Sequence, residues 1–90
     1  MKEKAKRIGV IGIIVRDRKS SASRVNDILS DHGDCIIGRM GIPYDAEGIN
    51  VIAIIIHGTT DDIGALTGKL GSLKDVDVRS VLVDAKGDRR

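Results

Sequence analysis

The chain has 90 residues, the length of one small domain, and 41% of them are hydrophobic, which suffices for a core without disulfides. One Cys excludes an internal disulfide and favours a reducing cytoplasm, and the net charge is only +2. No apolar run is long enough to span a bilayer, so a membrane partner is not expected. With one Tyr and no Phe or Trp, the core must be aliphatic.

The first predicted element is an apolar strand over residues 8–15, IGVIGIIV, after a charged segment over residues 1–7. A basic start before an apolar run could be read as a signal peptide, but a charged loop follows at once and no small-residue cleavage site is present. Asp17 in that loop is a favourable N-cap for a helix over residues 18–31, which Gly33 ends. The apolar stripe of this helix comprises Ala22, Val25, Ile28 and Leu29.

A second strand is predicted over residues 35–42, CIIGRMGI, and a turn over residues 43–47 follows it. Because side chains of a strand alternate between its faces, the residues divide into two sets. These sets are Ile36, Met40 and Ile42 on one face, and Cys35, Ile37 and Arg39 on the other.

The stretch over residues 48–73 combines a strand and a helix. Residues 51–56, VIAIII, form an unbroken apolar run typical of a strand buried on both faces. Thr59 and Asp62 have the spacing of a capping box, which predicts that a helix begins there. Gly71 is expected to end it in the left-handed conformation. The apolar stripe of this helix comprises Ile63, Leu66 and Leu70.

Two glycines, Gly64 and Gly68, lie inside this helix, where each costs about 1 kcal/mol relative to Ala. Together with Gly71 they form a stripe that lies far round the helix from the apolar stripe. Close contact with the other helix or with a second subunit is the favoured interpretation of this stripe. A bound group is the alternative.

The last predicted strand covers residues 76–83, VDVRSVLV, and a charged tail follows. The order βαββαβ is typical of the ferredoxin-like α+β sandwich, here one domain over residues 1–90 with a core of about residues 8–83. Right-handed crossovers predict a four-stranded antiparallel sheet in the order 4-1-3-2, with two helices on one face. Charges at Arg39, Asp77 and Arg79 suit the two edge strands.

Two helices cover only one face of such a sheet, yet both central strands are apolar on both faces. The uncovered face would expose on the order of 500 Å², from a strand spacing of about 4.8 Å and a rise of about 3.3 Å per residue. That is a large apolar patch for a monomer, so we expect a homodimer or tetramer. The candidate interface residues are Ile11, Ile13, Val15, Ile52, Ile54, Gly64 and Gly68.

Three segments, RDRKSSASRVNDIL, GRMGIPYDAEGINVIAIII and TDDIGALTGKLGSLKDVDV, resemble the family of iron-only hydrogenase system regulators. The motif IGALTGKLG is the most specific part. The resemblance implies a small ferredoxin-like protein, similar to ACT domains and to the C-terminal domain of the nickel-responsive repressor. It implies a non-enzymatic regulatory module that oligomerises and responds to a small-molecule ligand or a protein partner. The alternative is a structural or protein-interaction module with no ligand of its own.

A small-molecule ligand of this module is expected near the loop that follows the first strand. The candidate ligand-binding residues are Arg16, Asp17, Arg18, Arg39 and Tyr44. ACT domains usually have glycine in this loop, and this chain has charged residues there instead.

Three residues of metal-ligand type, His32, Cys35 and His57, are expected at one end of the sheet. If the hairpin closes at Pro43 and Gly48, Cys35 lies opposite residue 56 and on the other face from His57. The nickel-responsive repressor uses a His-rich site that contains Cys, whereas this chain has two His and one Cys. We therefore predict no metal and no cofactor.

Catalysis and specific nucleic-acid binding are not expected. The spacing suggests no nucleophile with a paired His, and no Gly-rich phosphate loop is present. The sheet lacks the aromatic residues on which RNA-binding domains stack bases. The fold uses residues 8–83, so no helix-turn-helix unit remains. The basic residues of both tails would support only weak, salt-sensitive binding of nucleic acid.

Overall fold

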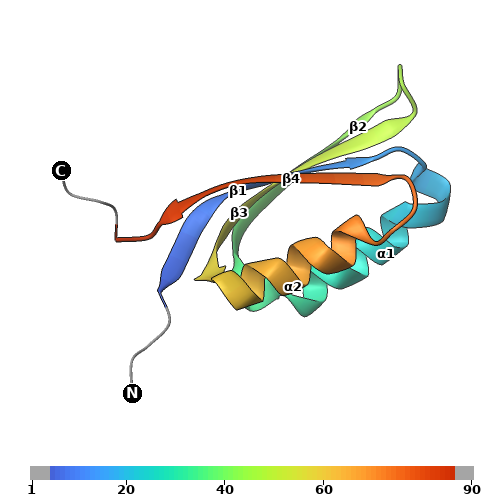
Figure 1. Cartoon of the computed structure of the whole chain (residues 1–90). Coiled ribbons are helices and arrows are strands. Elements are labelled where there is room, and N and C mark those ends of the chain that lie inside the picture. The colour runs from blue at the N-terminus through green and yellow to red at the C-terminus, as the bar shows by residue number, and fades with distance from the viewer. Residues whose placement is uncertain (1–4, 87–90) are drawn as a thin grey trace.

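The chain folds into an antiparallel sheet with two helices on one face, in a computed structural model that describes residues 5–86 (Figure 1). The strand order is β2-β3-β1-β4, and every pairing is antiparallel. This confirms the predicted ferredoxin-like fold and its order 4-1-3-2. In chain order the elements are β1 (Lys6–Val15), α1 (Arg18–Asp31), the 3-10 turn η1 (Gly33–Cys35), β2 (Ile36–Tyr44), β3 (Ile49–Thr59), α2 (Thr60–Gly71) and β4 (Val76–Asp84).

Both helices begin at the predicted caps. The backbone N–H of Lys19 donates to the Asp17 carboxylate at 3.2 Å, so Asp17 is the N-cap of α1. At α2 the N–H of Asp62 donates to Thr59 Oγ1 at 3.1 Å, and the N–H of Thr59 donates to Asp62 Oδ2 at 3.2 Å. This reciprocal pair is the predicted capping box.

The end of α2 differs from the prediction. Gly71 is the last helical residue, and the C-cap is Ser72, whose φ of −80° is right-handed. The N–H of Ser72 donates to the Gly68 carbonyl at 3.1 Å, and its hydroxyl donates to the Lys69 carbonyl at 2.8 Å. The predicted left-handed Gly71 is therefore wrong, because Ser72 already satisfies carbonyls of the last turn. The chain turns left-handed later, at Asp75, with a φ of 64°.

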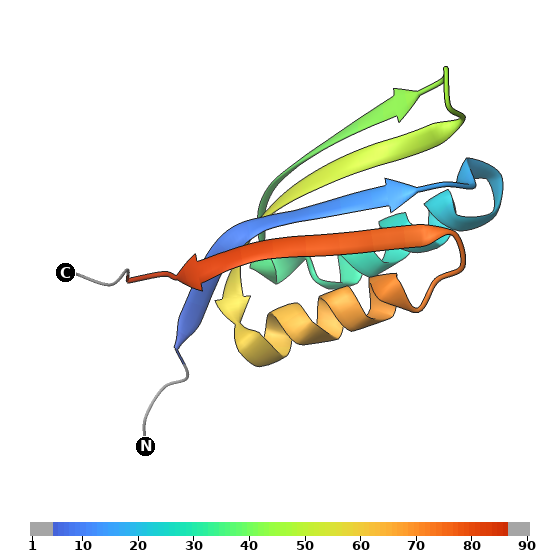
Figure 2. The same ribbon diagram turned by 45° about the horizontal axis from the view of Figure 1, so that its top comes forward.

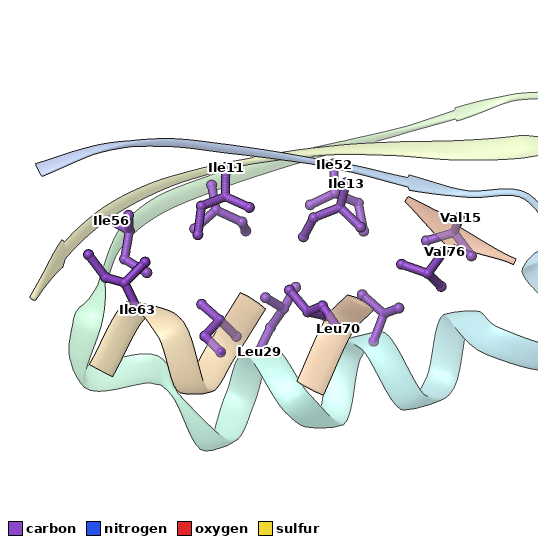
Figure 3. Packing of buried hydrophobic residues seen from close by; sticks show 12 residues of the cluster. Ile11, Ile13, Val15, Leu29, Ile52, Ile56, Ile63, Leu70 and Val76 are labelled. Carbon is purple, nitrogen blue, oxygen red and sulfur yellow. The ribbon is translucent and has the colours of Figure 1, made fainter. Parts of the chain in front are cut away.

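The core lies between the sheet and the helices, and its side chains point toward one another from both layers (Figure 3). It is entirely aliphatic, as predicted. Burial of each such side chain contributes about 1.5–3 kcal/mol, so this layer is the main source of stability. Its members are Ile11, Ile13, Val15, Val25, Leu29, Ile52, Ile54, Ile56, Ile63, Leu66, Leu70 and Val76.

Most of the predicted interface residues belong to this core. Ile11, Ile13, Val15 and Ile54 are fully buried, and Ile52 is 6% exposed. Their predicted contact with a second subunit is therefore wrong. β1 and β3 are apolar on both faces, so the alternation alone could not show which set of residues meets the helices. The other set lies on the helix-free side.

The hairpin that joins β2 and β3 closes later than predicted. Tyr44 pairs with Ile49 and Pro43 with Asn50, so the turn comprises residues 45–48 rather than 43–47. Pro43 is tolerated in β2 because this strand lies at the edge of the sheet. The hairpin projects beyond the layer of helices (Figures 1 and 2).

A bulge in β2 also corrects the predicted alternation. Ile36 pairs with Ile56, but Gly38 pairs with Ile55, so one extra residue, Ile37, is inserted at this point. The extra residue moves Ile36 to the helix side, whereas Met40 stays on the other side. The prediction that Ile36 and Met40 share a face is therefore wrong. The sequence could not reveal this, because nothing in the residue pattern of β2 indicates a bulge.

Candidate functional site

The side of the sheet without helices is an apolar surface, here named the open face. Strand pairing places the exposed large hydrophobic residues on this side, apart from Ile37, which lies in the bulge. Their exposed fractions range from 39% to 74%. The residues are Val10, Ile37, Met40, Ile42, Tyr44, Val51, Ile55, Val81 and Val83.

Small residues occupy the centre of the open face. Gly12 of β1 pairs with Ala53 of β3, and Ala53 pairs in turn with Met40 of β2. Small side chains here would let a second layer of structure approach closely. Charge is confined to one side, where Asp77 and Arg79 lie on the edge strand β4.

The candidate ligand residues of the first loop have structural partners. Arg16 Nε lies 2.6 Å from Asp77 Oδ2, and both side chains are about half exposed, so this ion pair contributes at most about 1 kcal/mol. Asp17 caps α1, and a hydrogen bond from the Ser20 side chain is the main reason that the pKa of its carboxyl is lowered. The side chain of Arg18 lies outside the described part of the structure.

The two remaining candidates, Arg39 and Tyr44, lie on opposite sides of β2. Tyr44 is on the open face and 52% exposed. Arg39 pairs with the core residue Ile54 and therefore faces the helix side. Because Arg16 pairs across to β4, the structure does not gather the predicted ligand residues into one site.

Arg39 instead lines a groove between α1 and the edge strand β2, here named the Arg39 groove. Its volume is about 230 Å³. A guanidinium nitrogen of Arg39 donates to Asn26 Oδ1 of α1 at 2.9 Å. Asn50 Oδ1 is buried and has no hydrogen-bond partner among the described residues. The lining residues are Asn26, Arg39, Gly41, Ile42, Pro43, Asn50 and Ile52.

Sequence reasoning missed Asn26 and Asn50. Nothing in the helical pattern of α1 showed that Asn26 would reach the edge strand. Asn50 did carry a signal, because it directly precedes the apolar run of β3 and shares the core-facing register of Ile52 and Ile54. A polar residue at such a position would have been a candidate.

A second groove, of about 430 Å³, runs between α2 and β4. Three of its polar side chains have partners within the chain: Asp77 pairs with Arg16, and Arg79 donates to the backbone oxygen of Val78 at 2.8 Å. The hydroxyl of Thr67 donates within its own helix. These three side chains are therefore already committed to contacts within the chain.

The residues of metal-ligand type lie in different environments. His32 Nε2 is 3.2 Å from Lys69 Nζ, which links the end of α1 to α2. Burial, with smaller effects of Asp62 and Asp34, raises the pKa of the Cys35 thiol. The alternation of side chains along β3 places His57 on the open face. Over residues 5–86 no group of three or more His, Cys, Asp or Glu could hold a metal ion, and the predicted absence of metal stays a prediction.

Three comparisons relate the chain to known proteins. No curated protein matches it. A model of the family described as "TM1266-like: Iron-only hydrogenase system regulator, putative" matches residues 7–80. Among solved structures, the chain is similar to the uncharacterized protein TM1266 from Thermotoga maritima, with 35% identity and a TM-score of 0.83 over 87% of this chain and 98% of that one. Since both matches extend over most of its length, the chain belongs to the TM1266-like family.

Proposed function

We propose that this protein is a non-enzymatic regulatory module of an iron-only hydrogenase system. It assembles as a homodimer or tetramer through its open face, and it responds to a small-molecule ligand or a protein partner. The family description supports the regulatory role. The observation that carries the assembly is the concentration of large exposed apolar side chains on the open face.

The size of the open face supports this assembly. An apolar area on the order of 500 Å², together with its polar rim, approaches the roughly 800 Å² that each partner buries in a standard interface. At about 25 cal/mol per Å², burial of this surface is a strong drive for association, even after an entropic cost of about 4–15 kcal/mol. A second copy is the natural occupant, because a two-fold axis lets identical surfaces cover each other.

The non-enzymatic role is supported by the state of the one thiol. A raised pKa keeps Cys35 protonated, which is unfavourable for a nucleophile. The alternative, a structural module with no ligand of its own, would assemble in the same way. Thermal melts with added metabolites distinguish the two, because a ligand that binds the folded state raises its apparent stability.

A matched pair of substitutions tests the assembly. Ala53→Glu places a charge at the centre of the open face, whereas Ala65→Glu places one on the exposed side of α2. Light scattering at about micromolar concentrations is expected to report a dimer or tetramer for the wild type and for Ala65→Glu, and a monomer for Ala53→Glu, because an unpaired charge is costly to bury. A monomeric wild type, or Ala53→Glu that assembles like Ala65→Glu, would refute the proposal.

Regulation is proposed to act without specific DNA recognition by this protein. Residues 5–86 form the sandwich and contain no helix-turn-helix unit. Most of the basic tail residues lie outside this range, and the net charge of +2 favours only weak, salt-sensitive binding. A mobility-shift assay at physiological salt should show no discrete complex that survives non-specific competitor. The appearance of such a complex would contradict the proposal.

A further inference from the structure

The outer edge of β4 is a regular strand edge with which no other strand of residues 5–86 pairs (Figure 2). β4 pairs with β1 from Val76 to Asp84 without a register shift. The other edge strand, β2, carries Pro43 and the bulge at Ile37, and both features hinder the addition of a further strand. Of the two edges of the sheet, that of β4 is therefore the one suited to pair with another chain.

Backbone hydrogen bonds at the two ends of β4 show which residues are directed to this free edge. The N–H of Arg16 donates to the Asp75 carbonyl at 2.7 Å, and the N–H of Ala85 donates to the Lys6 carbonyl at 2.9 Å. Because hydrogen-bonded pairs alternate along an antiparallel ladder, the odd-numbered residues between these ends bond to β1. The even-numbered residues of β4 therefore direct their N–H and C=O groups outward.

The two charges on the first half of β4 are spaced to complement a second copy of the same strand. Asp77 and Arg79 both lie on the open-face side, with Val78 between them. When two copies pair antiparallel about a two-fold axis at Val78, Asp77 of each copy lies opposite Arg79 of the other. Val78 then forms the hydrogen-bonded pair, so the charged residues occupy the adjacent non-hydrogen-bonded pairs, where side chains approach most closely.

Neighbouring registers lose this complementarity. An axis at Asp77 or at Arg79 would set that residue against its own copy, and like charges directly opposite each other are destabilising. An axis at Ser80 would place both charges opposite valines. The axis at Val78 is therefore the one that pairs both charges, and the overlap of the strands covers residues 76–80 of each copy.

The present contacts of these two side chains are compatible with such a partner. Arg79 Nη1 donates at 2.8 Å to the carbonyl oxygen of Val78, a group on the free edge. The N–H of the partner's Val78 would take that place and release the guanidinium. Asp77 Oδ2 lies 2.6 Å from Arg16 Nε, and a carboxylate has two oxygens, so Asp77 can accept from a second guanidinium as well.

The helix side of the same edge has room for the added strand. The groove of about 430 Å³ between α2 and β4 has Thr67 and Gly71 on its helix wall. Gly64 and Gly68 continue this stripe, and over residues 5–86 a Cβ at any of the three glycines would meet nothing within 4 Å. A second copy on the edge of β4 brings its own α2 alongside this stripe, and small side chains at the contact let two helices approach closely.

We propose that the free edge of β4 binds β4 of a second copy of this chain, antiparallel about a two-fold axis at Val78, to form one continuous sheet of both copies. This contact goes beyond the open-face assembly because it uses a different surface. Its axis is perpendicular to the sheet, whereas that of the open-face contact is parallel to it, so the two contacts together form a closed tetramer. The short overlap makes the β4 contact the weaker one, so Ala53→Glu remains monomeric at micromolar concentrations.

Cysteine cross-linking tests this contact and its register. The residue on the axis meets its own copy within reach of a disulfide, so Val78→Cys, combined with Cys35→Ser, should form a linked dimer under mild oxidation at about 0.5 mM protein. Ser80→Cys in the same background is the control, because it lies about 13 Å from its own copy and should link at least about tenfold more slowly. Linking is expected with or without Ala53→Glu, so a failure of the open-face assembly leaves this test intact.

A mixing experiment tests the charges. In the Val78→Cys background, Arg79→Asp makes both charged positions acidic and Asp77→Arg makes both basic, so each variant alone should link at least about tenfold more slowly. An equimolar mixture restores the opposite-charge pairs and should recover the rate, as a mixed dimer identified by its mass. Arg24→Asp, on the exposed side of α1, carries the same charge change as Arg79→Asp and should leave the rate unchanged. The proposal is overturned if Val78→Cys forms no linked dimer, if Ser80→Cys links as fast, or if the mixture links no faster than the separate variants.

Discussion

Gly9 of β1 lies so close to Val81 of β4 that a Cβ at position 9 would overlap the Val81 carbonyl oxygen. The same Cβ would come within 2.9 Å of the Cα atom of Leu82. Both obstacles are backbone atoms of the neighbouring strand, so they cannot move aside as a flexible side chain would. The pairing of β1 with β4 therefore requires glycine at this position.

Gly9→Ala is accordingly expected to lower the free energy of unfolding by about 1–3 kcal/mol, the usual cost of overpacking. Gly12→Ala, in the same strand, is the control, because a Cβ there would have its nearest atom, the Arg79 carbonyl oxygen, at 4.0 Å. Urea denaturation of both variants measures the difference. Equal stabilities would show that the two strands can separate without cost.

The glycine stripe of α2 faces open space. Over residues 5–86 a Cβ at Gly64, Gly68 or Gly71 would meet nothing within 4 Å, so the predicted contact with the other helix is wrong, and a second subunit or a bound group remains as the close neighbour. If the assembly is a tetramer that uses α2 as a second contact, Gly68→Leu is expected to reduce it to the open-face dimer in light scattering, whereas Lys69→Leu is not. Leu stabilises a helix by about 1 kcal/mol relative to Gly, so Gly68→Leu is not expected to lower the melting temperature by weakening α2. Unchanged assembly in Gly68→Leu would exclude an interface role.

Cys35 is expected to react slowly and to make stability depend on alkaline pH. Its pKa is raised in the folded chain, first by burial and then by Asp62 and Asp34, so the folded state retains a proton that the unfolded state loses. This contribution to stability is complete below the ordinary thiol pKa and is lost as the pH rises from that value through the raised one. Cys35→Ser should remove this part of the pH dependence.

Alkylation with iodoacetamide at neutral pH is a direct measurement of the same thiol. The folded protein should react more slowly than the chain unfolded in urea, since the thiolate is the nucleophile and burial suppresses it. Equal rates for the folded and the unfolded chain would mean that Cys35 is accessible and ionises normally.

Protein purified without added metal is expected to contain no stoichiometric transition metal. Two His and one Cys of one chain cannot fill a four-ligand tetrahedral site, and His57 lies on the open face, away from the helix side. Elemental analysis is the measurement. One metal ion per chain that disappears in His32→Ala or Cys35→Ala would reveal a site shared between subunits.

The sequence by itself determined the elements and their order. Asp17 caps α1, and Thr59 with Asp62 caps α2, through contacts between residues at most three positions apart, so a local pattern suffices to find them. The strand order followed from the βαββαβ order of the elements and from the right-handedness of crossover connections, which is a general property of polypeptide chains. No helix over the described residues is long and apolar enough to cross a membrane.

The tertiary structure alone decided which side of each strand is buried. Ile11 and Val10 are equally apolar neighbours in β1, yet the helices bury the first and leave the second 44% exposed. The bulge at Ile37 likewise depends on contacts between distant segments. So does the Arg39 groove, which is lined by Asn26, Arg39 and Asn50 from three different elements. When a strand is apolar at every position, its alternation of side chains does not show which face will be buried. Only the packing of the helices against one face decides this.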